Sequence, residues 1–198
     1  MDWPNLLPLL TPIFQSYCDG EHVPGCAFGV VSGGQLVLNG SVGIMNPGAA
    51  ETPAADTVYR IASMTKCFGA LAILLLRDEG KLRLDDPAAD YLPELRDLHY
   101  PTRDSALITV RQLLTMSTGW PEDNSWGDRQ LWRADAQLSE ILGGGIPFAN
   151  APGVTFEYSN LGYMTLGRIV GVVSGESSLS FITRRILQPL GMGDTVWN

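Results

Sequence analysis

The spacing of apolar and polar residues predicts a short sheet near the start of the chain and a mostly helical body after it. The apolar stretch before Gly20 is typical of an amphipathic helix. Two runs rich in strand-forming residues, Cys26–Val31 and Gln35–Gly40, are joined through Ser32-Gly33-Gly34. Two such runs with a short glycine-rich link predict an antiparallel hairpin.

Residues 44–57 are rich in proline, alanine and glycine and therefore predict a loop. Val58–Ile61 predicts a short extended piece that leads into a long helix. We expect that helix to begin near Ser63, to contain the apolar run Ala70–Leu76 and to end at Gly80, because glycine commonly follows the last residue of a helix.

Three more helices are predicted further along the chain. Thr109-Val110-Arg111-Gln112 has the sequence of a capping box, in which two side chains bond to each other's backbone. The helix that it opens should end near Gly119. Leu161–Val173 has apolar residues at helical spacing, and Ser180–Leu187 predicts a last helix.

The amino-acid composition and the net charge exclude several classes of protein. The chain has 198 residues, of which 45% are hydrophobic, and this is enough apolar surface for a folded core. The net charge is −8 and the basic residues are scattered, so we expect no nucleic-acid partner. The apolar runs are too short for a membrane span, and the first residues lack the charge of a signal peptide. We therefore expect a cytoplasmic protein, unless a leader has been removed.

The three cysteines form no Cys-x-x-Cys pair, so no structural zinc site is expected. Neither a metal nor a cofactor is expected elsewhere. The two histidines, His22 and His99, stand alone in loops and are interpreted as surface residues. Cys67 lies in the long helix and is expected in the core.

Ser63-Met64-Thr65-Lys66 has the Ser-x-x-Lys form at the start of the long helix. Residues three apart lie on one face of a helix, so Lys66 is expected beside Ser63. A serine hydroxyl is a weak nucleophile that needs a neighbouring base, and a lysine in a dry pocket can serve as that base. The small and apolar neighbours of Lys66 favour burial over the alternative of a helix cap with an exposed lysine.

Tyr158-Ser159-Asn160 stands just before another predicted helix. In an extended segment residues two apart point the same way, so Tyr158 and Asn160 are expected to face one pocket. A phenol near an amine can relay a proton, and an amide can hold both the lysine and a substrate. The alternative is that Asn160 only caps the helix and Tyr158 packs in the core. The presence of both motifs in one chain favours a shared site.

Several segments resemble the serine hydrolase superfamily of β-lactamases and penicillin-binding proteins, in particular class C β-lactamases, DD-peptidases and esterase relatives. Pro152–Tyr163 resembles the Tyr-x-Asn region of that family. Leu113–Gly119 resembles its Leu-Leu-x-His-Thr-Ser-Gly stretch, with Met116 where a histidine is common. Pro24–Gly43 resembles the opening hairpin, and Pro189–Thr195 resembles the segment after the Tyr-x-Asn region. The resemblance spans nearly the whole chain.

The resemblance implies an α+β fold of the β-lactamase/transpeptidase type, with an antiparallel sheet flanked by helices and a helical subdomain. It implies one β-lactamase-related domain over residues 1–198. The N-terminal helix and the strands would lie in residues 1–62, and the mostly helical subdomain in residues 63–198.

The resemblance also implies a serine hydrolase that forms an acyl-enzyme. In this interpretation Ser63 is the nucleophile, Lys66 and Tyr158 activate it, and Asn160 binds the substrate. The partner would be a small acyl compound: a β-lactam, a D-alanyl peptide or a small ester.

The family's third motif, Lys-Thr-Gly or His-Thr-Gly, is missing, because the sequence has no lysine or histidine after Asn160. In the family this motif lies on a strand that also carries an oxyanion-binding N–H. We therefore expect a domain that is truncated before the third motif, with an incomplete sheet that a C-terminal segment or a second chain completes. The alternative function is a non-hydrolytic penicillin-binding or sensor-like module, or an inactive fragment.

Overall fold

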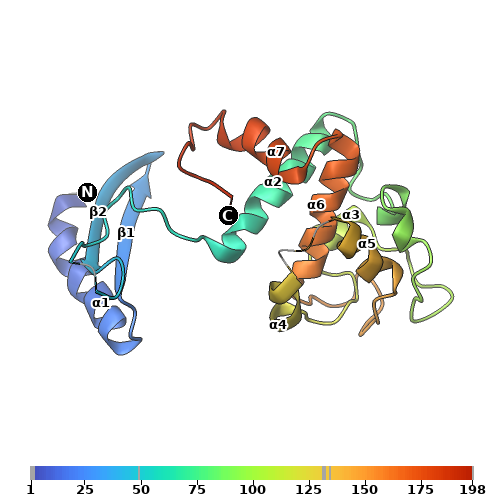
Figure 1. The fold of residues 1–198 in the computed structure, drawn as a ribbon, viewed down its shortest axis with the longest axis horizontal. Coiled ribbons are helices and arrows are strands. Elements are labelled where there is room, and N and C mark those ends of the chain that lie inside the picture. Colours follow the sequence, from blue (N-terminus) through green and yellow to red (C-terminus); the bar gives the residue numbers. More distant parts are fainter. Residues whose placement is uncertain (1–2, 49, 131–132, 134, 198) are drawn as a thin grey trace. The chain divides into compact units, whose positions relative to one another are not determined.

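The computed structural model describes residues 3–48, 50–130, 133 and 135–197, and its chain divides into two compact units (Figure 1). The first unit is Met1–Arg60 and the second is Ile61–Asn198. In the described part of the chain, the first unit holds the strands and the second is helical. No helix among the described residues is long and apolar enough to cross a membrane.

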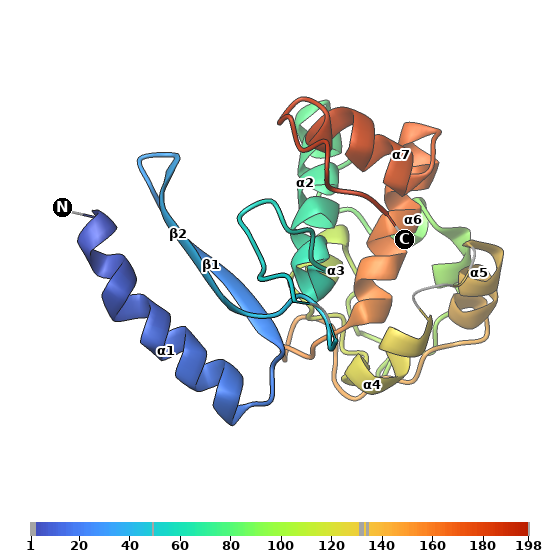
Figure 2. The ribbon, with the colours of Figure 1, turned by 60° about the vertical axis from the view of Figure 1, so that its left-hand side comes forward.

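The first unit is a helix packed on a β-hairpin (Figure 2). Helix α1 (Leu7–Gly20) precedes strands β1 (Gly25–Ser32) and β2 (Gln35–Gly43), which pair antiparallel from Gly25 opposite Gly43 to Ser32 opposite Gln35. The two strands make the only sheet found in the described residues. The predicted helix and the predicted hairpin are both confirmed.

The turn and the packing of this unit follow from small and aromatic residues. Gly33 and Gly34 have φ of 58° and 76°, and two successive positive φ values are what a tight two-residue hairpin turn requires. The rings of Phe14 on α1 and Phe28 on β1 stack with their centroids 4.1 Å apart. This contact fixes the helix against the hairpin.

The long helix of the second unit begins slightly later than the sequence pattern indicates. Val58–Ile61 forms neither helix nor strand, and Ala62–Met64 is a 3-10 turn. Helix α2 (Thr65–Asp78) follows, and Gly80 with φ of 70° comes just after its end, as predicted. Ser63 therefore lies in the turn that leads into α2.

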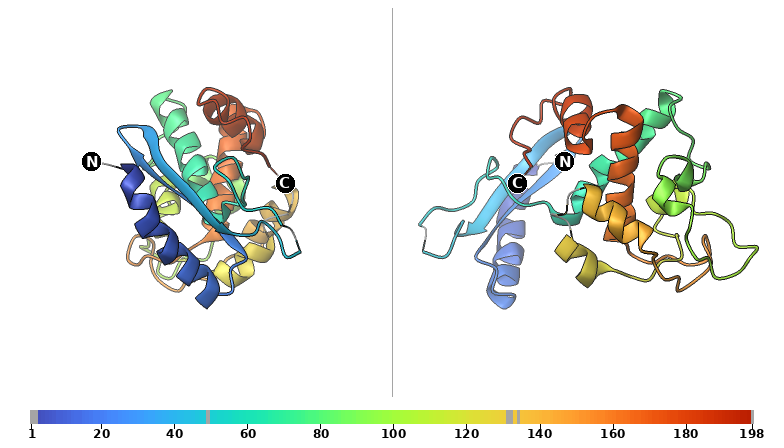
Figure 3. Two further views of the ribbon diagram at one scale, coloured as in Figure 1. Left: turned by 90° about the vertical axis from the view of Figure 1, so that its left-hand side faces the viewer. Right: turned by 45° about the vertical axis from the view of Figure 1, so that its right-hand side comes forward.

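The core of the second unit forms where α2, α6 (Asn160–Ser174) and α7 (Ser178–Ile182) meet (Figure 3). A π-helical turn, Thr183–Leu187, continues α7. The predicted helices in these segments are confirmed. The largest fully buried side chains include Ile73, Leu76, Trp120, Leu166, Ile169 and Phe181.

Helix α3 (Val110–Leu114) opens with the predicted capping box. The side chain of Thr109 accepts from the backbone N–H of Gln112, whose side chain accepts from the backbone N–H of Thr109. The helix ends at Leu114, so the prediction that it reaches Gly119 is wrong. The chain turns at Met116, where φ is 53°, and a left-handed residue stops a helix.

Two helices have no counterpart in the sequence prediction. They are α4 (Asn124–Gly127) and α5 (Asp135–Gly143). Helix α5 is tied to α6 by Arg168, which donates to the backbone carbonyl of Asp135 at 2.9 Å. Arg168 also forms an ion pair of 2.9 Å with Glu94 in the 3-10 turn Pro93–Leu95. These helices are too short to contain a long run of apolar residues at helical spacing. Contacts with distant parts of the chain stabilise them instead.

Candidate active site

The serine of the Ser-x-x-Lys motif is placed by an unusual backbone. Ala62 has φ of 45°, which lies in the left-handed region that residues with a Cβ seldom adopt. The 3-10 turn starts at this residue and presents the exposed side chain of Ser63 just before α2. Strained backbone of this kind is often found at functional sites, where the surrounding structure maintains it.

The amine of Lys66 is the centre of the site. Its Nζ lies 3.2 Å from Ser63 Oγ, 2.7 Å from the hydroxyl oxygen of Tyr158 and 2.6 Å from Asn160 Oδ1. An ammonium group has three N–H donors, so each donor has one acceptor in this arrangement. The structure therefore brings together the four side chains that the two sequence motifs indicated.

The hydroxyl group of Tyr158 bridges the lysine and the serine. Its oxygen lies 2.5 Å from Ser63 Oγ, and the Lys66 amine lies 4.7 Å from the centre of the Tyr158 ring. Burial is the largest single effect on the pKa of Tyr158 and raises it. Hydrogen bonds with Lys66 and Ser63 and the lysine charge lower the pKa by more, so it lies below its ordinary value.

The amide of Asn160 has a defined orientation. Its Oδ1 accepts from Lys66, and its Nδ2 donates to the carbonyl of Asn124 at 3.4 Å. The helix cap is Ser159, whose Oγ accepts from the N–H of Gly162 at 2.8 Å. The side chain of Asn160 is thus directed at Lys66. The alternative, that Asn160 only caps α6, is wrong because Ser159 provides the cap.

Two expectations about burial need correction. Lys66 is half-buried rather than enclosed, and Cys67 is exposed rather than in the core. Both lie in the first turn of α2, while the buried stripe of this helix, Ala72, Ile73 and Leu76, begins further along. The apolar neighbours that suggested burial therefore belong to the part of α2 beyond the site.

Asp123, which sequence reasoning did not identify, lies directly behind the Tyr158–Asn160 segment. Its side chain accepts from the Ser159 hydroxyl at 2.7 Å, from the N–H of Asn160 at 2.7 Å and from the N–H of Leu161 at 3.0 Å. Only 9% of the residue is exposed. No local pattern in the sequence distinguishes this buried acid from an ordinary loop residue.

The segment before Tyr158 is also held by backbone bonds. The N–H of Glu157 donates to the carbonyl of Met116 at 2.9 Å, and the N–H of Gly153 donates to the carbonyl of Ser117 at 2.7 Å. Met116 stands where the β-lactamase and penicillin-binding-protein superfamily commonly has histidine. Its backbone, in the left-handed conformation, provides one of these contacts. The loop that carries Tyr158 is fixed at several points along its length.

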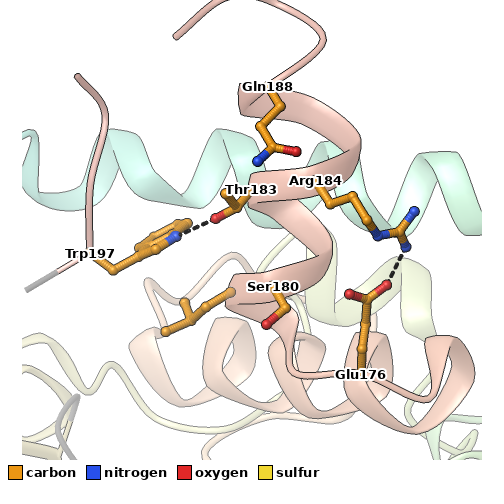
Figure 4. Close-up of a pocket in the computed structure, with 7 residues that line it drawn as sticks. Glu176, Ser180, Thr183, Arg184, Gln188 and Trp197 are labelled. Atoms are coloured by element: carbon orange, nitrogen blue, oxygen red, sulfur yellow. Dashed lines mark hydrogen bonds and ion pairs between the residues drawn. The ribbon is translucent and has the colours of Figure 1, made fainter. Parts of the chain in front are cut away.

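A shallow groove elsewhere in this unit is used for packing of the chain itself (Figure 4). The indole N–H of Trp197 donates to Thr183 Oγ1 at 2.9 Å, and Arg184 forms an ion pair with Glu176. The lining of this groove contains neither Lys66 nor any of the three side chains bonded to its amine. Among the described residues there is also no group of three or more His, Cys, Asp or Glu side chains that could hold a metal ion.

Comparisons with known proteins agree with one another. A family model described as beta-lactamase matches residues 10–198. The chain is 34% identical over 176 residues to Protein flp of Staphylococcus aureus (strain MRSA252), which covers 88% of this chain and 35% of that protein. It is 30% identical over 203 residues to the D-alanyl-D-alanine-carboxypeptidase/endopeptidase AmpH of Escherichia coli (strain K12), which covers 96% of this chain and 52% of that protein.

A solved structure shows the same fold. The octameric penicillin-binding protein homologue from Pyrococcus abyssi matches with a TM-score of 0.78 and 30% identity, over 98% of this chain and 44% of that one. This likeness confirms the α+β fold of the β-lactamase/transpeptidase type. The chain spans about a third of the length of Protein flp and about half of that of AmpH.

Proposed function

Because the chain belongs to the beta-lactamase family, we propose that it is a serine hydrolase that works through an acyl-enzyme on Ser63. The observation that carries the proposal is the position of the Lys66 amine, which is bonded to Ser63, Tyr158 and Asn160 at once. Such a reaction needs a nucleophile, a group that accepts the proton of the nucleophile, and a charge that holds this acceptor in place.

In the first step Ser63 Oγ attacks the carbonyl carbon of the substrate, and its proton passes to the Tyr158 oxygen at 2.5 Å. The tetrahedral intermediate collapses as the bond to the leaving group breaks, and the leaving group takes the proton from Tyr158. The positive charge of Lys66 stabilises the phenolate form that receives the proton. The product of this half-reaction is an ester between Ser63 and the acyl group.

In the second step a water molecule attacks the ester and gives one proton to Tyr158. The acyl–oxygen bond breaks, and the proton returns to Ser63 Oγ as the acid leaves. Lys66 remains bonded to its neighbours in both steps, so its role is to hold Tyr158 and Asn160 in place. Asn160 would hold the polar part of the acyl compound beside the lysine.

The proposed substrates are a β-lactam, a D-alanyl peptide or a small ester, all of which carry a carbonyl carbon that a serine can attack. The name of AmpH, a D-alanyl-D-alanine-carboxypeptidase/endopeptidase, supports the D-alanyl peptide. The name of a solved relative, the penicillin-binding protein homologue from Pyrococcus abyssi, supports a second candidate, a penicillin-binding module that is acylated without turnover.

A single assay separates the two candidates. The protein is mixed with an activated ester or a chromogenic β-lactam, and both product release and the intact mass are followed with time. Steady release with a transient adduct supports the hydrolase, while a lasting adduct supports the binding module. In both cases peptide mapping should place the adduct on Ser63, and Ser63→Ala should abolish it.

Ser32→Ala is the matched control, because this exposed serine lies at the end of β1 in the other unit. It should be acylated like the unchanged protein. If no probe modifies Ser63 at any concentration or pH, neither candidate is correct.

A further inference from the structure

The buried carboxylate of Asp123 is hydrogen-bonded to the segment that carries Tyr158 and Asn160. We infer that Asp123 is a positioning residue, which sets the place of Tyr158 and Asn160 relative to Lys66. This inference rests on the proposed function, because it assigns Asp123 a role in acylation of Ser63. Asp123 itself does not contact Ser63 or Lys66 in any hydrogen bond of the described residues, so it acts through its neighbours.

Asp123 holds the segment before α6 with both its side chain and its backbone. The carboxylate accepts three hydrogen bonds, from the Ser159 hydroxyl and from the N–H groups of Asn160 and Leu161. The N–H of Asp123 donates to the carbonyl of Tyr158 at 3.2 Å. The peptide unit after Tyr158 and the peptide units on both sides of Asn160 are therefore fixed to one residue.

The bonds go beyond what a helix cap requires. Ser159 already caps α6 through the N–H of Gly162. Asp123 accepts instead from the first two N–H groups of the helix, where the helix dipole also favours a negative charge. The same carboxylate therefore stabilises the helix end and fixes the residue that carries the amide at Lys66.

The short helix α4 brings Asp123 and Asn160 close together because it ends in glycine. A Cβ on Gly127 would lie 2.7 Å from Asn160 Cβ and 2.8 Å from Asp123 Oδ1, which is closer than real atoms pack. The carbonyl of Asn124, on the same helix, accepts from the Asn160 amide. Asn160 is thus enclosed by α4 on one side and bonded to Lys66 on the other.

The consequence for catalysis is geometric. Lys66 makes its bonds to Tyr158 and Asn160 at 2.7 and 2.6 Å, so a shift of the Tyr158–Asn160 segment by a fraction of an ångström would weaken both. Displacements of about 1 Å in a catalytic group can lower a rate by about 10²-fold. A residue that prevents such displacement should affect the rate of acylation more than it affects folding.

The test compares two variants, one at the buried carboxylate of Asp123 and one at the partly buried carboxylate of Glu94. Asp123→Asn keeps the volume but places an amide N–H₂ against donors, so at least one of its three bonds is lost. Glu94→Gln is the matched control, because it weakens the ion pair of Glu94 with Arg168, which lies away from the Lys66 group. We measure the rate of Ser63 acylation by an activated ester at saturation, and thermal unfolding of both variants.

We expect acylation to fall about 10- to 100-fold in Asp123→Asn and to change less than about twofold in Glu94→Gln, although both unfold at lower temperature. Equal acylation rates in Asp123→Asn and the unchanged protein would overturn the inference. So would an equal loss of rate in both variants, since a general loss of stability would then explain the effect.

A second readout does not depend on acylation. The ultraviolet titration of Tyr158, taken as the difference from the same protein with Tyr158→Phe, reports how closely Lys66 approaches the phenol. In Asp123→Asn the midpoint should move upward, and in Glu94→Gln it should stay in place. If the unchanged protein is never acylated, the proposed function fails, and an unmoved midpoint in Asp123→Asn then separately refutes the role of Asp123.

Ser159→Ala provides the same test if Asp123→Asn does not fold. It removes one of the three donors to the carboxylate and leaves the two N–H groups in place. The expected loss in acylation is smaller, about threefold to tenfold, and the titration should move in the same direction. An unchanged rate together with an unchanged titration contradicts the inference.

Discussion

The hydroxyl oxygen of Tyr158 lies 2.5 Å from Oγ of Ser63, although the two residues are 95 positions apart in the chain. The serine lies in the turn before α2, and the tyrosine lies in the loop before α6. The two helices pack against each other, so the starts of both are brought to one place. The predictions below test what this proximity does.

Tyr158→Phe should slow acylation of Ser63 by about 10²- to 10⁴-fold, the usual range for loss of a positioned proton acceptor. The phenyl ring keeps the packing, so thermal unfolding should change little. Time-resolved intact mass measures the rate. Tyr91→Phe is the control: its hydroxyl donates to Asp86 at 2.7 Å, away from Ser63, so this variant should acylate normally. A normal rate in Tyr158→Phe would show that another group accepts the proton.

The acylation rate should rise with pH, with a midpoint below about 10, because the pKa of Tyr158 lies below its ordinary value. Lys66→Met removes the bonds and the charge that lower this pKa and leaves the burial that raises it. The rate profile and the ultraviolet titration of Tyr158 should therefore both move to higher pH. Lys81→Met is the control, since Lys81 pairs with Glu79 instead. A titration that stays in place in Lys66→Met would contradict this account.

The same pKa has a consequence for stability. The pKa of Tyr158 is lower in the folded protein than in the unfolded chain, so ionisation of Tyr158 adds to the free energy of unfolding. This contribution is fully present above the pKa that Tyr158 has in the unfolded chain. It is lost as the pH falls through the pKa that Tyr158 has in the folded protein. Denaturant unfolding at a pH near 10 and at neutral pH should show this contribution in the unchanged protein, whereas Lys66→Met should lack it.

Ala62→Gly should leave the free energy of unfolding unchanged or raise it by up to about 1.6 kcal/mol. A residue with a Cβ pays about 1–2 kcal/mol in the left-handed region, and the added freedom of glycine in the unfolded chain offsets about 0.4–1 kcal/mol of the relief. The control is Ala70→Gly within α2, which should lower the free energy by about 1 kcal/mol. Denaturant titrations compare the two. Equal losses would mean that the backbone at Ala62 is not strained.

Thr109→Ala should lower the free energy of unfolding by about 1 kcal/mol, because it removes the cap of α3. Gln112→Ala breaks the other half of the same box and should have an effect of the same sign. Thr52→Ala in an exposed loop serves as the control for loss of a threonine side chain. If all three variants unfold at the same denaturant concentration, the capping box contributes nothing.

Local sequence patterns predicted the parts of the fold that local forces determine. The hairpin follows from two strand-forming runs around Gly33 and Gly34, and the start of α3 follows from the Thr109 box. Both features depend on residues that are close together in the sequence. The juxtaposition of the two motifs around Lys66 was predicted on another basis, namely that both motifs occur in one chain and resemble those of one family.

Features that depend on distant contacts were missed. Helices α4 and α5 are short, and their positions depend on contacts with distant residues, such as that of Arg168 with the backbone carbonyl of Asp135. Glu122 and Asp123 are neighbours of like charge, yet the first is exposed and the second is buried. Only the packing of α4 against α6 distinguishes them. Cys67 is exposed because it lies in the first turn of α2, before the buried stripe of that helix begins at Ala72.

The exposed thiol of Cys67 makes the protein easy to follow by spectroscopy. Cys18 is buried and Cys26 is partly covered, so a water-soluble maleimide dye should react first at Cys67. This residue follows Lys66 directly, so an attached fluorophore would lie at the edge of the site. Its emission should change when an acyl group occupies Ser63, which would make binding visible in real time with unmodified, colourless substrates.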